Sequence, residues 1–457
     1  TFTTIDEDSE EHFYTLLEDA EGRFTVTEDG QLKQVQEDIP AGTSHQINVR
    51  STDPENFSID RHFTIEIVGD DYVRANDLLD FGTTQSNYRI IGIPFQSTSI
   101  DNIFEGLNES GQGTEWRIVR YSNGSNADLT SLGSSLSGGN GYWFLSSSPV
   151  TINLGAGNLN NGSTFPKSLS SGWNMIANPF LSPINWADIL AYNISQGNMN
   201  DGDIVGSTFY TWDTNSWQMH TGNYEIAMMQ GGFVNASSNL SSFEFPSPTQ
   251  TTGSRISLSN KLANSYHERP DEWQLLLDLR SEDMYSNISG VGIAPDASSQ
   301  KDLMDIAPPP SFLQPFQLTE KTTGLTRNFK PNEETVVWDF VLTGAKEATT
   351  ISWDHGTASY LEKPLMIALL PQGNVIDMRS VGQITFEPSD NQTVMVIYGD
   401  ELPIELISKS ITAYPNPVDK EVSFHFYVDG EGQTNAYVDL YNMSGQQIGS
   451  INKRVWG

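Results

Sequence analysis

Hydrophobic and polar residues alternate over short runs along most of the chain, and this period of two predicts β-strands. Residues 273–279 place Trp273, Leu275 and Leu277 on one face, and residues 337–342 alternate in the same way. No heptad pattern occurs, and no apolar run approaches the roughly 18 residues of a membrane helix. The pattern predicts an all-β fold, arranged as a multidomain chain of β-sandwiches.

The first predicted domain spans residues 1–70. Short runs at 24–26 and 31–33 flank Glu28-Asp29-Gly30, a turn sequence that predicts a hairpin. Two longer alternating runs follow, at 46–50 and 62–68. This spacing predicts one small β unit.

Residues 83–246 contain an internal repeat. The segment 88–95 aligns with 173–180, and both segments end in Pro-Phe. In each copy the same features follow in order: a short run with helical spacing, an aromatic strand, a glycine-aromatic strand and a closing alternating strand. The two copies, about 88–154 and 173–245, indicate one supersecondary unit that is duplicated. Because two units are too few for a solenoid, we expect a pseudo-twofold all-β domain.

Two further domains are predicted after the repeat. Residues 255–403 contain several alternating or continuously apolar runs, which predict a β-sandwich. Residues 404–410 are expected to be a short linker. Residues 411–457 contain alternating runs at 422–428 and 436–441, which predict a small β domain.

Composition narrows the function classes. The chain of 457 residues carries 58 acidic and 24 basic side chains, for a net charge of −34. Such a surface repels nucleic acid and anionic lipid, so neither is an expected partner. The absence of cysteine excludes disulfides and thiolate metal sites. We therefore expect a chain stabilised by its hydrophobic cores.

The last domain carries the most specific motif of the chain. It begins with Tyr414-Pro415-Asn416-Pro417, where the two prolines fix φ and remove two donors, so that the entry strand is stiff. This motif, the hairpin after it and Gly445 resemble the C-terminal sorting domain of proteins exported by type IX secretion in Bacteroidota. The chain stops at Gly457, before the further strands of that family. We therefore expect the domain to be incomplete at its C-terminus.

The resemblance implies a small Ig-like β-sandwich that acts as an export address. Its sorting-signal residues would be Tyr414, Pro415, Asn416, Pro417 and Gly445. The implied partners are the type IX translocon and its shuttle and attachment proteins, and the implied location is extracellular or at the cell surface, without membrane insertion. The alternative is a proline-rich linker between domains.

The first domain resembles a bacterial cadherin-like repeat whose first strand is missing. The resemblance rests on Asp6-Glu7-Asp8, on the strands listed above and on Asp53. In that family the equivalent aspartates bind calcium at the junction with the preceding repeat, so Asp6, Asp8 and Asp53 are the candidate metal ligands. Calcium requires six to eight oxygen ligands, and the remainder would come from an upstream repeat. The alternative is that these aspartates are solvated turn residues.

A search for catalytic motifs finds none of the familiar ones. The chain has no His-Glu-x-x-His, no Gly-x-Ser-x-Gly, no P-loop and no dinucleotide fingerprint. A hydrolase within residues 255–400 would need paired carboxylates or a carboxylate beside a histidine; Asp354-His355 is such a pair, which we interpret as a loop. No catalytic residues are predicted, and the chain is expected not to be an enzyme.

Aromatic residues supply an alternative function. They cluster in the duplicated domain, where exposed rings could stack on sugars, whereas buried rings would form the core. Tyr142 and Trp143 are adjacent on one predicted strand, so at most one faces the domain's own core. The nine candidates are Trp116, Tyr121, Tyr142, Trp143, Trp173, Trp186, Tyr210, Trp212 and Trp217.

Two hypotheses of function follow. The first is a secreted or cell-surface protein without catalytic activity, exported through its sorting domain and part of a long adhesin or surface fibre. The second is the carbohydrate-binding region of a secreted polysaccharide-degrading protein, with a glycan as ligand. The only expected cofactor is calcium.

Overall fold

The computed structural model describes residues 2, 4, 12–27, 30–35, 44–66, 72–74, 79–248, 272–298, 301–302, 304–400, 412–414, 423–425, 433–441 and 446–456. Within these ranges the chain is built from β-sheets, almost all antiparallel, and three short α-helices. The all-β fold that the alternation predicts is therefore confirmed.

The N-terminal unit has one three-stranded sheet in the order β1-β4-β5 and a separate β2-β3 hairpin. Its small core contains Tyr14, Phe24, Ile47 and Val49. The strands are β1 (Phe13–Glu18), β2 (Phe24–Val26), β3 (Leu32–Gln34), β4 (Ser44–Thr52) and β5 (Ser58–Glu66). A further strand, β6 (Tyr72–Arg74), pairs with β14 of the next unit.

The first copy of the repeat forms a four-stranded sheet in the order β11-β10-β13-β7, with a β12-β8 ladder and a β14-β9 ladder beside it. Its elements are β7 (Arg89–Ile91), β8 (Ser97–Ser99), α1 (Ile100–Ile103), β9 (Phe104–Glu105), β10 (Trp116–Ser122), β11 (Ser125–Asp128), β12 (Ser135–Ser137), β13 (Tyr142–Ser146) and β14 (Thr151–Asn153).

The second copy repeats this topology. Its four-stranded sheet has the order β19-β18-β21-β16, with a β20-β17 ladder beside it and a β15-β22 ladder. Its elements are β15 (Thr164–Pro166), β16 (Gly172–Ala177), β17 (Ile184–Asn185), α2 (Trp186–Ser195), β18 (Phe209–Asp213), β19 (Ser216–His220), β20 (Glu225–Ile226), β21 (Gly231–Ala236) and β22 (Glu244–Pro246).

The two copies meet along two lines of contact, which we call seams. Equivalent residues of the two copies make equivalent contacts in the two seams, with the roles of the copies reversed. In the first seam, Ile91 of β7 lies opposite Gln230, and in the second seam Ile176 of β16 lies opposite Asn140. Ile91 and Ile176 are equivalent in the repeat, and so are Gln230 and Asn140. Exchange of this kind is the mark of a twofold relation, here within one chain.

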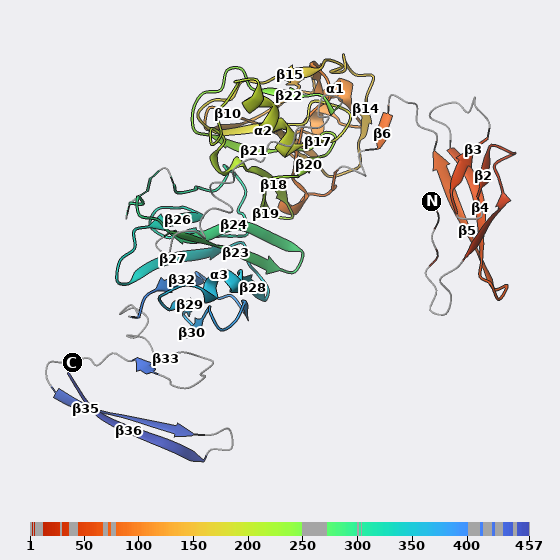
Figure 1. Ribbon diagram of the computed structural model, residues 1–457. Coiled ribbons are helices and arrows are strands. Elements are labelled where there is room, and N and C mark those ends of the chain that lie inside the picture. The colour runs from red at the N-terminus through yellow and green to blue at the C-terminus, as the bar shows by residue number, and fades with distance from the viewer. Residues whose placement is uncertain are drawn as a thin grey trace.

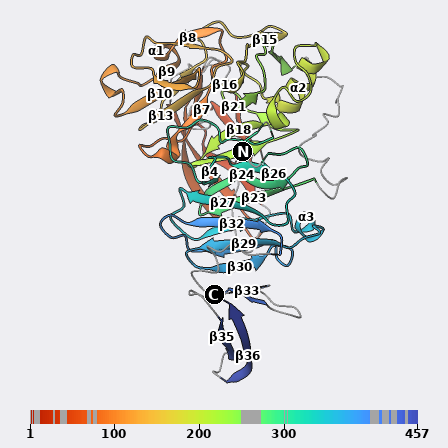
Figure 2. The same cartoon turned by 90° about the vertical axis from the view of Figure 1, so that its left-hand side faces the viewer.

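The next unit is a sandwich of two five-stranded sheets, in the orders β26-β24-β23-β28-β31 and β25-β27-β32-β29-β30. Figure 2 shows β27, β32, β29 and β30 one below the other in that order. The elements are β23 (Trp273–Ser281), β24 (Met284–Ile293), β25 (Gln317–Glu320), β26 (Arg327–Lys330), β27 (Val336–Thr343), β28 (Thr349–Ser352), α3 (His355–Ser359), β29 (Leu365–Leu370), β30 (Asn374–Asp377), β31 (Gln383–Phe386) and β32 (Thr393–Tyr398).

Alternation along β23 and β27 builds the sandwich core. Trp273 from one sheet packs edge-on against Trp338 from the other, with ring centroids 6.0 Å apart. Burial along β23 follows the predicted face, and β29 and β32 are buried over nearly their whole length. Near the C-terminus, β33 (Thr412–Tyr414) pairs with β34 (Ser423–His425), and β35 (Gln433–Tyr441) pairs with β36 (Gln447–Trp456). Figure 1 shows these strands beyond β30, with which β33 is in contact.

Candidate functional site

The predicted sorting-signal residues are only partly described. Tyr414 ends β33, which pairs antiparallel with β34. Pro415, Asn416, Pro417 and Gly445 lie outside the described residues. Their assignment as sorting residues therefore stays a prediction.

Of the predicted calcium ligands, only Asp53 is described; Asp6 and Asp8 lie outside the described residues. Asp53 is buried in the turn between β4 and β5, and its Oδ1 accepts a hydrogen bond of 2.8 Å from the backbone N–H of Phe57. This contact gives Asp53 a turn-capping role of its own. The described residues hold no group of three or more His, Cys, Asp or Glu side chains that could bind a metal ion.

The aromatic side chains of the duplicated domain are largely buried. Seven of the nine candidates are in the core, and Tyr121 and Trp173 are half-buried. Tyr142 and Trp143 point in opposite directions, as the alternation predicted: Tyr142 belongs to the core of the first copy, and Trp143 belongs to a different cluster. The exposed row of rings that would favour sugar stacking is not formed by these nine residues.

Trp143 lies in an aromatic cluster that joins the duplicated domain to the following sandwich. Its ring is 5.4 Å from Trp212, 5.6 Å from Trp217 and 5.6 Å from Phe312 of the sandwich, all edge-on. Ile288 of β24 is buried in the same cluster. We call this contact the domain junction.

The first seam contains a pocket with a volume of about 270 Å³. We call it the seam pocket. Its walls come from the start of the first copy, from the β18–β19 hairpin and from the turn before β21. The lining residues are Leu79, Arg89, Ile90, Ile91, Ile152, Thr211, Trp212, Asp213, Gln218, Tyr224, Ala227, Met228, Met229, Gln230 and Gly231.

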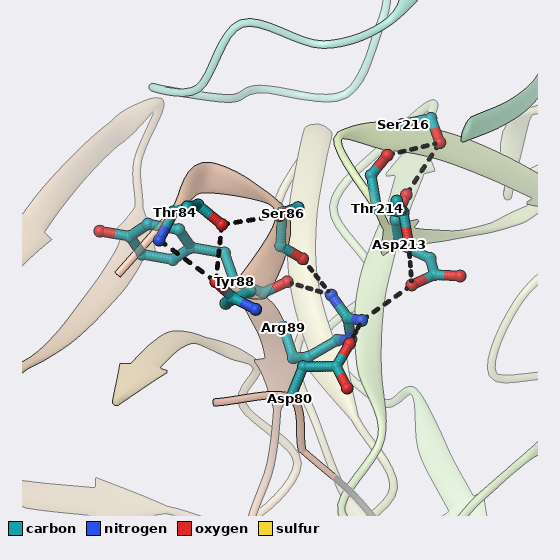
Figure 3. Close-up of polar contacts among 9 residues, drawn as sticks. Asp80, Thr84, Ser86, Tyr88, Arg89, Asp213, Thr214 and Ser216 are labelled. Carbon is teal, nitrogen blue, oxygen red and sulfur yellow. Dashed lines mark hydrogen bonds and ion pairs between the residues drawn. The ribbon is translucent and has the colours of Figure 1, made fainter. Parts of the chain in front are cut away.

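Arg89 ties the two copies together at the edge of this pocket. Figure 3 shows its guanidinium between Asp80 and Asp213. Nη2 is 3.0 Å from Oδ1 of Asp213 and also binds Asp80, while Nη1 donates to the backbone carbonyls of Ser86 and Tyr88. Because Asp213 ends β18 of the second copy, this arginine crosses the seam.

A connected set of polar side chains forms the opposite wall. Thr211 Oγ1 is 2.7 Å from Nε2 of His220, and the His220 ring stacks on Tyr224 at a centroid distance of 3.7 Å. Gln230 Nε2 donates to the hydroxyl of Tyr224 at 2.7 Å. Burial lowers the pKa of His220 to about 4, so its imidazole is neutral at pH 7. The wall therefore presents neutral donors and acceptors.

The second seam is filled at the related position. There the glycines Gly138 and Gly139 lie against the ring of Phe165, and Lys167 Nζ binds Oδ1 of Asn140. In the first seam the equivalent residues are Met228, Met229 and Gln230, which line the seam pocket. At this position the backbones of the two copies are equivalent, but the side chains differ.

A second pocket, of about 540 Å³, lies on the first copy near the domain junction. Arg117 pairs with both oxygens of Asp128 through Nε and Nη2, at 2.5 and 3.0 Å, and the guanidinium carbon lies 4.7 Å from the centroid of the Phe312 ring. Asp128 raises the pKa of Arg117. The charged groups of this pocket, Arg117 and Asp128, are therefore paired with each other.

The Asp354–His355 pair is found at a helix start. Asp354 is the N-cap of α3, where its side chain accepts from the N–H groups of Gly356 and Thr357. His355 Nε2 lies 2.8 Å from the carbonyl of Arg379. The two side chains therefore make separate structural contacts.

Sequence reasoning missed the residues of the seam pocket. Arg89, Thr211, His220 and Tyr224 carry no motif. The available signal was the repeat itself, because aligning the two copies places Gly138-Gly139 opposite Met228-Met229. A change from no side chain to a long one at an internal contact indicates that the two seams differ.

No protein-family model matches the chain, and no curated protein matches it. Among the described residues, no helix is long and apolar enough to cross a membrane. What is established is the class of fold: a multidomain all-β chain of packed sheets.

Proposed function

We propose that the chain is a secreted or cell-surface protein without catalytic activity, exported by type IX secretion and part of a long adhesin or surface fibre. The observation that carries this proposal is the motif Tyr414-Pro415-Asn416-Pro417, whose Tyr414 ends β33, together with the strand pairs β33–β34 and β35–β36. The paired strands support it, because the sorting domain is a small β-sandwich. The packed aromatic contacts of the domain junction also suit a structural part of a fibre.

The test is export of a truncated chain. Deleting residues from Tyr414 onward should retain the protein inside the cell, because the export machinery would have no address to bind. The measurement is the fraction of protein in the medium and on the cell surface, relative to the full-length chain. The control removes residues 12–66 instead, which should leave export unchanged. Normal export of the chain truncated at Tyr414 would refute the sorting assignment.

Calcium remains a proposal for the junction upstream of the N-terminal unit. Asp6, Asp8 and Asp53 would supply part of the coordination shell, and an upstream repeat would supply the rest. A calcium chelator should then lower the melting temperature only of a chain that includes that repeat.

A second candidate function is carbohydrate binding, as part of a secreted polysaccharide-degrading protein. Because most of the nine aromatic residues are buried, they do not form a flat surface on which a sugar could stack. The observation that favours this candidate is the seam pocket, which combines neutral polar groups with an apolar wall.

A further inference from the structure

We propose that the seam pocket binds a single neutral sugar ring. This inference rests on the second candidate function, carbohydrate binding, and is independent of the export route. If no sugar binds, the export proposal is unaffected, and if export does not depend on the sorting motif, the sugar proposal is unaffected. It rests on the charge, the hydrogen-bonding capacity and the shape of the pocket, which are taken in turn below.

The charge at the pocket disfavours an anion. Both terminal nitrogens of Arg89 are engaged, by two carboxylates and two backbone carbonyls. One guanidinium faces the two carboxylates of Asp80 and Asp213, which leaves one negative charge at the pocket edge. The whole chain carries a net charge of −34. A phosphate, a sulfate or an acidic sugar would be repelled by this field.

Neutral polar groups line the pocket, and one of them, Gln218, has unused hydrogen-bonding capacity. Thr211 and Gln218 are cross-strand neighbours in the β18–β19 hairpin, so their side chains share one face. Within the described part of the chain, no hydrogen bond engages the side-chain amide of Gln218, although the amide lines the pocket. Asp213 lies two residues from Thr211 on the same face. An amide that both donates and accepts, beside a carboxylate that accepts, matches the hydroxyl groups of a sugar.

The other wall is apolar. Ile91 of β7 and Met229 of the turn before β21 belong to one hydrophobic cluster, and both line the pocket together with Ile90 and Met228. Such a wall suits the C–H face of a sugar ring, and the flexible thioethers of methionine adapt to its shape. The volume of about 270 Å³ is just below that of typical ligand pockets, which hold about 300 to 1,000 Å³, and this favours a single ring over a longer oligosaccharide.

The second seam provides an internal comparison. At the related position Phe165 and Lys167 occupy the space, and burial lowers the pKa of Lys167. If the pocket resulted only from the way the two copies pack, an equivalent pocket would be expected in both seams. Side chains fill the second seam, whereas the first seam leaves a pocket with a polar wall and an apolar wall, as expected when one seam is adapted to a ligand.

The experiment is calorimetric titration of the full chain with neutral monosaccharides: glucose, galactose, mannose and N-acetylglucosamine. At least one should bind, with an affinity that changes little between 50 and 500 mM salt, because the ligand is uncharged. Gln218→Met keeps the side-chain length and removes the amide, and it should weaken binding tenfold or more. The matched control is Gln112→Met in the second pocket, which should bind as the unaltered chain does. Melting temperatures confirm that both variants fold.

A second variant tests the same pocket in case Gln218→Met does not fold. Tyr224→Phe removes the hydroxyl that Gln230 contacts and retains the ring stacked on His220, so it should also weaken binding. The proposal is overturned if no neutral sugar binds at 50 mM. It is equally overturned if glucuronate binds more tightly than glucose, or if Gln112→Met causes the larger loss.

Discussion

At the scale of single residues, the duplicated domain places polar side chains beside aromatic rings in its interior. His220 shows the energetic consequence. Its ring is stacked on Tyr224, its Nε2 is next to Thr211, and burial lowers its pKa to about 4. In the unfolded chain the imidazole would titrate near its ordinary value of about 6.5.

We expect this histidine to make stability depend on pH. Below pH 6.5 the imidazole of His220 is protonated in the unfolded chain, whereas in the folded chain it stays neutral down to about pH 4. Folding stability therefore falls as the pH falls through this range. The expected loss between pH 7 and pH 5 is about 2 kcal/mol. His220→Gln should remove this part of the pH dependence, as measured by urea unfolding at both pH values.

His355 provides the matched control position, because this first residue of α3 is exposed. His355→Gln should retain the loss of stability between pH 7 and pH 5. Equal pH dependence in the unaltered chain and in His220→Gln would contradict the role assigned to His220.

At the scale of elements, the seams require backbones to approach closely. The N–H of Gly92 donates to the carbonyl of Met229 at 2.8 Å in the first seam, and Ala177 N–H donates to the carbonyl of Gly139 at 3.2 Å in the second. A Cβ at Gly92 would overlap the Cβ of Ala177. Because both atoms are fixed to strands, neither can move without shifting a sheet.

Gly92→Ala should therefore destabilise the duplicated domain by about 2 to 3 kcal/mol, the cost typical of overpacking. The matched control is Gly133→Ala, where an added Cβ has Ser131 Oγ as its nearest neighbour at 3.7 Å. That substitution should change stability by less than about 0.5 kcal/mol. Denaturant unfolding of the two variants measures the difference, and equal effects would argue against a close seam.

The sequence predicted strands better than it predicted the contacts between them. Period-two alternation identified the buried faces of β23 and β27, because strand geometry alone decides which side chains share a face. It also separated Tyr142 from Trp143. It could not locate the seam pocket, because that pocket depends on how one copy turns against the other. The limits of the domains stay a prediction.

At the scale of the whole molecule, the duplicated domain and the sandwich are joined by contacts of several kinds. The side-chain amide of Asn287 accepts from the N–H of Met219 at 2.6 Å and donates to its carbonyl at 3.1 Å, as a neighbouring strand would. Arg327, which is buried, donates to the Tyr210 hydroxyl at 2.9 Å. Figure 1 shows β19 beside β24, the two strands that the contacts of Asn287 join.

The β18–β19 hairpin contributes to both the junction and the seam pocket. Trp212 and Trp217 are cross-strand partners on the face that packs against the sandwich, whereas Thr211 and Gln218 are partners on the face of the pocket. Its two-residue turn at Thr214 and Asn215 has positive φ at both residues, which matches the twist of the strands. A shift of the sandwich would therefore move the wall of the pocket.

Because the junction is aromatic and largely buried, we expect the two units to unfold together. Phe312 is half-buried and packs against the cluster, with its ring 5.4 Å from that of Tyr88 and 5.6 Å from that of Trp143. Phe312→Ala should cost about 2 to 4 kcal/mol of junction stability and split one calorimetric transition into two. Tyr360→Ala is the matched control, because this ring is 88% exposed and its removal should leave the transition intact. A single, unshifted transition in Phe312→Ala would mean that the aromatic cluster does not couple the units, and that ligand binding in the seam pocket cannot be transmitted to the sandwich through it.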